Sequence, residues 1–257
     1  MLLRREEDRQ SASATALFMK FLELTLPTPE ENIALDEALL EEAEAAGDDR
    51  ELLRVWESPE PLVVIGRSSK IDQEADREVC EARGVPVIRR SSGGAAIVAG
   101  PGCLMYAVVL SYRRRPHLAK LDAAHREVLE PLAAALARRC PGVTWVGTSD
   151  LALHGQKFSG NSLRCKREHL VYHGTLLYDF PLEVVGALLK TPPRQPDYRA
   201  GRDHGAFIRN LPLTREAVRD AVVEAFPTDG ALAEWPQALT AQFVAEKYAQ
   251  AAWNARL

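Results

Sequence analysis

The sequence predicts an α+β fold with mixed, mostly antiparallel sheets flanked by helices. Helical and strand patterns follow one another irregularly along the 257 residues, whereas a doubly wound parallel sheet requires regular alternation of the two. No internal repeat or low-complexity segment breaks the pattern. The length and the apolar content of 46% are sufficient to bury a core without disulfide support.

The first predicted helix begins at the sequence Thr28-Pro29-Glu30-Glu31. Thr28 can cap the helix, Pro29 suits the first helical position, and Glu31 completes a capping box. The helical pattern ends near Gly47. The next elements follow from apolar runs and turn residues: strands at 52–56 and 62–65, a helix at 72–82, a strand at 85–88, a hairpin of 95–98 and 104–110, and a helix at 118–140 kinked or split at Pro131.

The second half of the chain predicts short strands, a long loop and two final helices. Gly155 is expected to turn one strand into the next. The loop at 191–210 lacks periodicity, and loops of this length in a compact domain are often functional. The predicted elements are strands at 144–146, 151–153, 156–159 and 170–177, a helix at 181–189, and helices at 214–225 and 236–251.

Composition and charge exclude several classes of protein. A net charge of −4 argues against a general nucleic-acid binder, and no run approaches the roughly 18 apolar residues of a membrane span. Residues 1–17 lack the apolar core of a secretory signal, and we expect a flexible tail there before a single domain at 18–257. The cysteines are far apart and form no CxxC pair, which predicts reduced thiols in a cytoplasmic protein; they are Cys80, Cys103, Cys140 and Cys165.

Charge is distributed unevenly along the chain. Residues 1–60 carry 16 acidic and 6 basic side chains, whereas residues 155–210 carry 9 basic and 5 acidic ones. A basic segment in an acidic protein predicts a site for an anionic ligand or an acidic partner. A solvated basic face is the alternative interpretation.

The segment RRSSGGAA at 89–96 contains the greatest concentration of residues typical of an anion-binding site. Its glycines let backbone N–H groups approach an anion, and arginine adds a charged fork for phosphate or carboxylate. The spacings of a P-loop and of a dinucleotide fingerprint are both absent. A tight hairpin with solvent-facing arginines is the alternative.

Two further segments contain residues capable of site chemistry. Lys157 opens a strand among glycine, serine and asparagine, where an ammonium can stabilise a phosphate or a developing oxyanion; an exposed lysine on a hairpin is the alternative. Cys165, His169 and His173 would align as metal ligands only on a helix, but their segment is expected to be loop and strand. We therefore expect His173 to be a hydrogen-bonded structural histidine beside the pocket. Neither a GxSxG nor an HExxH motif is present.

These segments in their order resemble the lipoate-protein ligase A family, which is grouped with biotin-protein ligases and octanoyltransferases. The resembling stretches are RRSSGGAAIVAGPGCL, SDLALHGQKFSGNS and YHGTLL, supported by ENIALDEALLEEAE and VVIGR, and together they span residues 18–212. The resemblance implies a biotin/lipoate-ligase-like catalytic domain. The final helices at 213–257 are too short for the full accessory domain of larger ligases, so a separate accessory subunit is an expectation.

The resemblance also implies an activity and a set of site residues. Lipoate would react with ATP, with Mg²⁺ present, to form lipoyl-AMP, and the lipoyl group would pass to a lysine of a lipoyl-domain acceptor. Lys157 would neutralise the charge that develops in both steps, and Asp150 would organise the nucleotide or a magnesium ion. The implied ATP and lipoyl-AMP site comprises Arg90, Ser92, Gly93, Gly94, Ala95, Ala96, Ile97, Asp150 and Lys157. The implied acyl-chain pocket comprises Gly94, Ala95, Val171, Tyr172, His173 and Gly174.

This chain departs from the family pattern in several places. Ala95 replaces the third glycine, Ala99-Gly100 replaces a histidine–aspartate pair, Cys103 replaces an asparagine, and Ser149 replaces the asparagine of an NDL motif. We expect the acceptor to dock near the basic segment 190–209.

Two other functions remain open. An octanoyltransferase would take its acyl group from acyl carrier protein through a cysteine thioester, for which Cys103 and Cys140 are the candidates. A non-catalytic acyl- or nucleotide-binding subunit would fit the altered loop. The ligase is favoured by the Lys157 segment followed by HGTLL, and we expect Cys103 to be a small buried residue and no cysteine to be a nucleophile.

Overall fold

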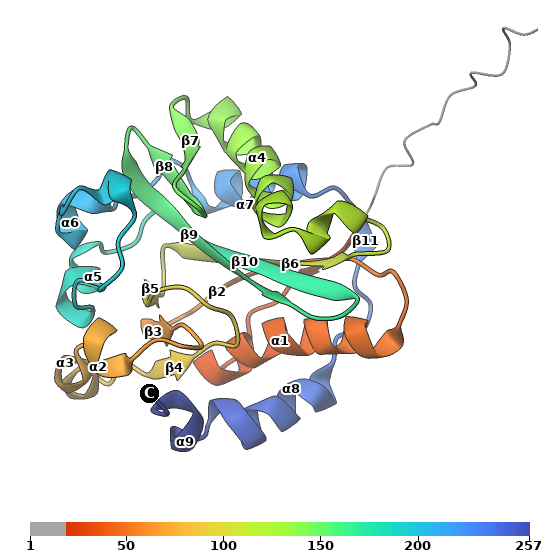
Figure 1. Ribbon diagram of the computed structural model, residues 1–257, viewed down its shortest axis with the longest axis horizontal. Coiled ribbons are helices and arrows are strands. Elements are labelled where there is room, and N and C mark those ends of the chain that lie inside the picture. Colours follow the sequence, from red (N-terminus) through yellow and green to blue (C-terminus); the bar gives the residue numbers. More distant parts are fainter. Residues whose placement is uncertain (1–18) are drawn as a thin grey trace, which may run out of the picture.

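The computed structural model describes residues 19–257 (Figure 1), so the tail predicted at 1–17 lies outside the described residues. An eight-stranded sheet crosses the molecule in the order β11-β1-β2-β6-β10-β9-β8-β7, and a three-stranded sheet has the order β4-β3-β5. The strands are β1 (Met19–Glu23), β2 (Leu52–Glu57), β3 (Leu62–Ile65), β4 (Val87–Arg89), β5 (Ile97–Ala99), β6 (Cys103–Ser111), β7 (Val143–Val146), β8 (Asp150–Leu153), β9 (Gln156–Cys165), β10 (His169–Leu177) and β11 (Thr228–Ala231).

Helices cover both faces of the large sheet. Helices α4 and α7 pack on one face, and α1 with the C-terminal helix α8 packs on the other, where the small sheet also lies (Figure 1). The α-helices are α1 (Pro29–Ala46), α2 (Ile71–Glu74), α3 (Arg77–Ala82), α4 (Leu121–Arg139), α5 (Glu183–Leu188), α6 (His204–Phe207), α7 (Arg215–Ala225), α8 (Gln237–Phe243) and α9 (Ala251–Asn254). Short 3₁₀ turns are η1 (Pro116–Ala119) and η2 (Asp197–Arg199), and η3 (Val244–Tyr248) is a π-helical turn.

The mixed, mostly antiparallel sheet of the prediction is confirmed. The strands from β2 through β6, β10, β9 and β8 to β7 pair antiparallel. The parallel pairs are β1 with β2, β1 with β11, and β3 with β4. The nine-residue strands β6 and β10 pair along their whole length at the centre, which gives the site a rigid floor.

The start and end of α1 follow from local chemistry, as predicted. The Thr28 hydroxyl accepts a hydrogen bond from the Glu31 N–H, and the Glu31 carboxylate accepts one from the Thr28 N–H. Gly47 ends the helix in the left-handed conformation with φ 63°. The predicted turn at Gly155 is also confirmed, with φ 51° at His154 and 78° at Gly155.

Three predicted elements were wrong in their organisation. The helix predicted at 72–82 is two helices, because Ala75 is extended and pairs with Leu189 before Asp76 caps α3. The hairpin predicted at 95–110 does not form, because β5 joins the small sheet and β6 the large one. The helix predicted at 118–140 is η1 followed by α4, which continues through Pro131.

The strands β1 and β11 and the division of the last helix were not predicted. β11 has the sequence TDGA and no apolar alternation, so only its pairing with β1 makes it a strand. The helix predicted at 236–251 consists of α8 and the turn η3, and α9 follows it. Among the described residues, no helix combines the length and apolar character that crossing a membrane would require.

Candidate active site

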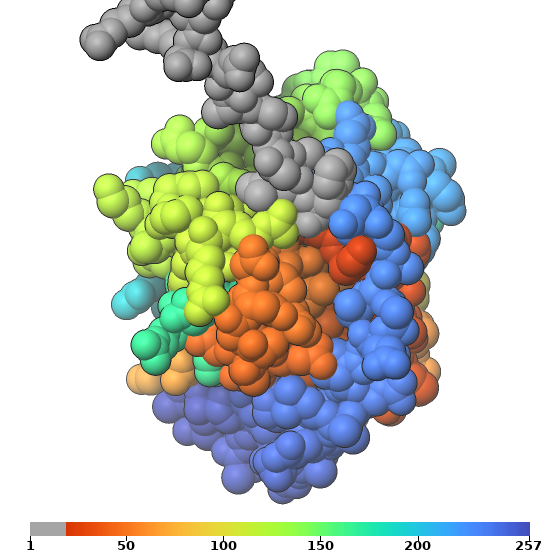
Figure 2. All heavy atoms as spheres, turned by 90° about the vertical axis from the view of Figure 1, so that its right-hand side faces the viewer, coloured from red at the N-terminus to blue at the C-terminus, as the bar shows by residue number. Residues whose placement is uncertain are grey.

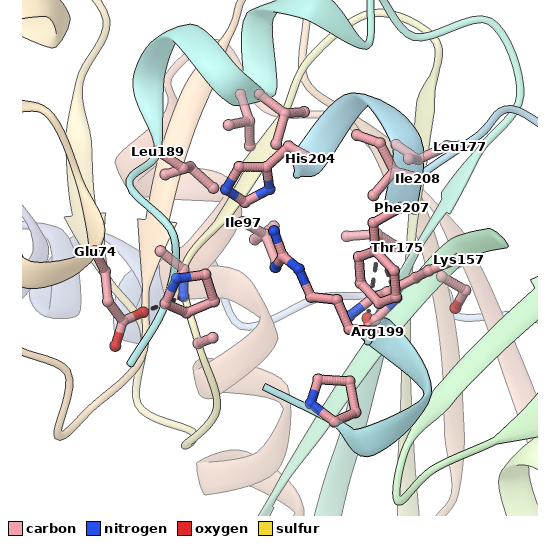
Figure 3. A pocket seen from close by; sticks show the side chains of 18 of the residues that line it. Glu74, Ile97, Lys157, Thr175, Leu177, Leu189, Arg199, His204, Phe207 and Ile208 are labelled. Atoms are coloured by element: carbon pink, nitrogen blue, oxygen red, sulfur yellow. Dashed lines mark hydrogen bonds between the residues drawn. The ribbon is translucent and has the colours of Figure 1, made fainter. Parts of the chain in front are cut away.

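A cleft with a cavity volume of about 130 Å³ opens between the small sheet, β9, β10 and the segment that follows α5 (Figure 3). The lining includes Ala95, Ala96 and Ile97 from the predicted nucleotide segment, together with Lys157 and Thr175 from the sheet. The loop predicted to be functional at 191–210 forms one wall with η2 and α6.

Lys157 projects into this cleft from the start of β9. Its ammonium lies 2.8 Å from Asp150 Oδ1 on the neighbouring strand, and the Tyr198 hydroxyl donates to Asp150 Oδ2 at 2.8 Å. A Cβ on Gly160 would lie 2.8 Å from the Lys157 Nζ, so the ammonium rests directly over that glycine. The structure thus brings together Lys157 and Asp150, two of the predicted site residues.

Arg90 organises the Ser/Gly turn from inside. Its Nε donates to Ser92 Oγ at 3.1 Å, and its Nη2 donates to the carbonyls of Gly93 at 2.5 Å and Ala95 at 3.0 Å. Burial lowers the pKa of Arg90 to about 10. The turn itself uses most of the guanidinium donors, which leaves few of them for the predicted contact with a nucleotide phosphate.

Arg89, the first arginine of the motif, points away from the cleft. Its guanidinium donates to the carbonyls of Trp253 and Asn254 in α9 and to that of Ser69. Arg89 and Arg90 are both buried, so the alternative of solvent-facing arginines was wrong.

The Ser/Gly turn also approaches the backbone at Gly66 closely. A Cβ on Gly66 would lie 1.9 Å from the Gly94 carbonyl oxygen, so only glycine permits this approach.

A chain of polar contacts connects the turn to the core. Ser92 Oγ lies 2.6 Å from His173 Nε2, and His173 Nδ1 lies 3.7 Å from Asp36 Oδ2. The Arg54 guanidinium donates to Asp36 Oδ1 at 2.5 Å. Burial opposes ionisation of Asp36, but Arg54 and His173 hold its pKa below the usual value. His173 is hydrogen-bonded, as expected, and its structural role stays a prediction.

The predicted acyl-chain residues do not all share one face of β10. Val171 and His173 lie against α1 and the turn, where both line a second cavity. Tyr172 points to the opposite face, where its hydroxyl lies 2.9 Å from His125 Nδ1 of α4. Gly174 faces the same way, because a Cβ there would meet Asn161 and Tyr106. Tyr172 and Gly174 thus point to the face of β10 opposite to Val171 and His173, since alternate strand residues face opposite sides.

Arg199 lines the cleft, whereas the sequence analysis included it only as one of the charges of the basic segment 190–209. Its side chain lines the cleft, is 3% exposed, and has one nitrogen, Nη2, without a hydrogen-bond partner (Figure 3). The guanidinium lies 4.8 Å from the Phe207 ring centroid. A buried, partly unpaired guanidinium in a cleft is suited to an anion. No local signal in the non-periodic loop predicts its burial.

The residues do not fit a magnesium site made by the protein. Lys157 and Tyr198 already contact the Asp150 carboxylate, and no group of three histidine, cysteine or acidic side chains within residues 19–257 could hold a metal. Cys165 and His169 lie on strands rather than on a helix, so the helical alignment considered for a metal does not occur.

Two of the departures from the family pattern, Ser149 and Cys103, have clear surroundings in the structure. Ser149 maintains a link to β9, because its hydroxyl donates to the Asn161 carbonyl at 2.9 Å. Cys103 is fully buried at the start of β6, and burial raises the pKa of its thiol to about 12. Cys80 and Cys140 are buried and Cys165 is exposed, and no cysteine is among the described residues that line the cleft.

A protein-family model, the lipoyl protein ligase A/B catalytic domain, matches residues 28–227. An inferred lipoate-protein ligase A of Aeropyrum pernix is 32% identical over 61% of this chain and 56% of its own length. A probable lipoate-protein ligase A of Mycoplasma pneumoniae is 29% identical over 63% of this chain and 46% of its own. The chain thus spans about half the length of these two curated relatives.

Another relative matches over nearly its whole length. Octanoyltransferase LipM of Kyrpidia tusciae is 27% identical over 88% of this chain and 94% of its own. Among solved structures, a bipartite lipoate protein ligase of Thermoplasma acidophilum, described with its E2 lipoyl domain, has a TM-score of 0.76 at 20% identity and covers 93% of this chain and 96% of its own. A lipoate-protein ligase A bound with ATP also has a TM-score of 0.76 at 20% identity, covering 93% and 99%. The structures show a shared lipoate-ligase fold.

Proposed function

The chain belongs to the lipoyl protein ligase A/B catalytic domain family, and we propose that within it the chain is an ATP-dependent lipoate–protein ligase. The observation that carries this proposal is Lys157. Its ammonium projects into the cleft opposite Ala95–Ile97, and no cysteine is among the described residues that line the cleft. Such a cleft supplies charge stabilisation rather than a thiol nucleophile.

The proposed reaction has two steps. A carboxylate oxygen of lipoate attacks the α-phosphorus of ATP, and pyrophosphate leaves. The amine of an acceptor lysine then attacks the carbonyl carbon of lipoyl-AMP, AMP leaves, and the amine loses a proton. Negative charge grows first on the phosphorus oxygens and then on the acyl oxygen, and the Lys157 ammonium would stabilise it in both steps.

The nucleotide is proposed to lie in the large cleft. The backbone of Ala95–Ile97 would flank it, and the unpaired Nη2 of Arg199 would donate to a phosphate oxygen. Magnesium would enter bound to the phosphates of ATP, because Lys157 and Tyr198 already engage the Asp150 carboxylate. The free state of all four cysteines agrees with the proposed cytoplasmic location.

The proposed partners are a lipoyl-type acceptor domain and a separate accessory subunit. In the basic segment 190–209, Lys190 and Arg194 are exposed and Arg202 and Arg209 are half-buried. These four side chains support the proposed docking site for an acidic acceptor. Arg199 is excluded from that surface, because it is buried in the cleft.

An octanoyltransferase is the second candidate function. The match to LipM over nearly its full length favours it. The burial and raised pKa of Cys103 argue against it, because a thioester mechanism needs an accessible thiolate.

The deciding experiment follows the acceptor by mass spectrometry. The purified protein is incubated with lipoate, ATP, magnesium and a lipoyl domain, and in parallel with octanoyl acyl carrier protein without ATP. We expect lipoylation that requires ATP and persists when all four cysteines are replaced by serine. ATP-independent octanoylation with an adduct on a cysteine would instead identify the transferase, and binding of ATP and lipoate without turnover would identify a non-catalytic subunit.

A further inference from the structure

A β-bulge at the start of β9 places Lys157 beside Asp150. Asp150 pairs with Gly160 and Ala152 pairs with Lys157, so β9 contains one residue more than β8 over this stretch. Residues that pair across two strands share a face, and so do strand residues two apart. Lys157 therefore lies on the face of Gly160 and Asp150, although a regular strand would point it to the opposite side.

The Asp150 carboxylate holds the ammonium with one oxygen and is itself held by the other. Oδ1 lies 2.8 Å from Lys157 Nζ, and Oδ2 accepts the hydrogen bond of the Tyr198 hydroxyl at 2.8 Å. The Tyr198 hydroxyl therefore fixes the rotation of the planar group that the ammonium contacts. Burial and the neighbouring Asp150 raise the pKa of Tyr198 above its usual value, so the hydroxyl remains a donor at neutral pH.

Tyr198 belongs to the segment that forms one wall of the cleft, residues 191–210. Its ring packs against Phe207 with the ring centroids 5.2 Å apart. The same segment is attached to β9 at Lys157, because the Arg209 N–H donates to the Lys157 carbonyl at 2.9 Å. The segment thus holds Lys157 at two points, directly at its backbone and, by way of Asp150, at its ammonium.

The wall segment is supported by the hairpin of β8 and β9. The Arg202 guanidinium donates to the Gly155 carbonyl at 3.1 Å, and the Gln156 amide donates to the Ala206 carbonyl at 3.2 Å. Figure 1 shows α6 at the left-hand edge, whereas Figure 2 faces the opposite side, where the C-terminal segment, coloured blue, lies against the region of α1, coloured orange. Contacts between α8 and α1 agree with this view. The hairpin that carries Lys157 therefore also carries the wall.

The groups that hold the ammonium are separate from the groups that face the cleft. Lys157 and Arg199 line the cleft, but Asp150 and Tyr198 do not. A substrate in the cleft would touch the ammonium without touching the carboxylate and the hydroxyl that hold it. Removing the Tyr198 hydroxyl should therefore change the placement of Lys157 and leave the surface that contacts the substrate intact.

We propose that Tyr198 is a positioning residue, which holds Asp150 so that the Lys157 ammonium stays fixed over Gly160 where negative charge develops in the reaction. The inference rests on the proposed function, because it takes Lys157 to stabilise that charge. A misplacement of about 1 Å can cost about 10²-fold in rate. Tyr198 thus raises the rate without contacting the substrate.

The test compares two variants that each lose one tyrosine hydroxyl, Tyr198→Phe and Tyr178→Phe. Tyr178 is the matched control, because it is half-buried, its hydroxyl donates to the Glu57 carboxylate at 2.8 Å, and it does not line the cleft. Pyrophosphate release gives kcat and the KM values for ATP and lipoate, and both substitutions are also made in Lys157→Ala. A crystal structure of Tyr198→Phe gives a readout that does not require activity.

We expect Tyr198→Phe to lower kcat about tenfold while both KM values stay within about twofold. Tyr178→Phe should match the wild type. In the Lys157→Ala background, Tyr198→Phe should cause no further loss, because no ammonium is left to position. The crystal structure should show Lys157 Nζ displaced from its place over Gly160. If Tyr198→Phe does not fold, Asp150→Asn should show the same loss of kcat and the same non-additivity.

Three kinetic results would overturn the proposal: a folded Tyr198→Phe protein with the wild-type kcat, a raised KM at unchanged kcat, or an additive loss in the Lys157→Ala background. An equal loss in Tyr178→Phe would also overturn it, because the effect would then be common to any lost tyrosine hydroxyl. A wild-type protein that releases no pyrophosphate would refute the ligase function alone. The crystal structure then decides the positioning role, which an undisplaced ammonium overturns and a displaced one supports.

Discussion

Replacing Lys157 with alanine should abolish most of the adenylation activity while leaving the fold intact. The side chain is 26% exposed, and its ion pair with Asp150 is 2.8 Å long. Partly exposed pairs contribute about 0.2–1 kcal/mol, and Asp150 would still accept the hydrogen bond of the Tyr198 hydroxyl. The free energy of unfolding should therefore fall by at most about 1 kcal/mol, a small part of the 5–15 kcal/mol typical of a native protein.

The expected loss of rate is far larger than this loss of stability. Removing one group that stabilises developing negative charge costs about 10²–10³ in rate, or about 2.7–4 kcal/mol in the barrier. Lys157→Arg retains the charge and should recover part of the rate. Gly160→Ala provides a finer perturbation, because its Cβ would lie 2.8 Å from the Lys157 Nζ and would displace the ammonium without removing it. We expect a rate between those of the wild type and Lys157→Ala.

The assay is pyrophosphate release with lipoate and ATP, with circular dichroism and thermal melting as controls for the fold. A folded Lys157→Ala protein that releases pyrophosphate within about threefold of the wild-type rate would refute the role of Lys157. Equal rates for Gly160→Ala and the wild type, with a normal melting temperature, would show that the exact position of the ammonium is unimportant.

Other residues give predictions for stability, reactivity and pH dependence. Arg54→Met should lower the free energy of unfolding by about 3–5 kcal/mol in urea titrations, because it leaves the buried Asp36 carboxylate without its charged partner. Gly94→Val should abolish pyrophosphate release, because φ is 86° there and a Cβ would lie 2.9 Å from the Arg90 Nη2. Cys103, with a pKa raised to about 12, should resist iodoacetamide at pH 8 while the exposed Cys165 reacts, as peptide mapping would show. Burial holds the pKa of His125 below its usual 6.5, so the unfolded chain takes up the proton first and the melting temperature should fall as the pH drops below about 6.5. His125→Gln should flatten that fall, and an unchanged pH profile would contradict it.

The parts of the structure that the sequence determined by itself depend on neighbouring residues. The capping box of Thr28 and Glu31 and the stop at Gly47 are decided within a few residues, and both were predicted. The turn at Gly155 and the position of Lys157 beside it also follow from local torsions. The order of three short motifs was enough to indicate the family, because chemistry at a site requires particular residues at close spacing.

The alternation of β10 was partly readable from the sequence. Val171 and His173 must share a face that excludes Tyr172, since successive strand side chains point in opposite directions. Which face meets the cavity depends on α1 and α4, which pack on opposite sides of the sheet. The sequence therefore contained the grouping of these residues, and only tertiary packing decided their surroundings.

Other features depend on contacts between distant parts of the chain. β5 and β6 belong to different sheets because their partners, β3 and β2, are set by pairing across the fold. The burial of Arg199 in the cleft depends on how the segment after α5 folds over the sheet. The burial of Tyr248 depends on packing against α1, where its hydroxyl donates to Glu37, 211 residues away. Propensity, caps and turns act over about four residues, whereas burial is a property of the assembled core. No local sequence pattern therefore predicts the burial of Arg199 and Tyr248.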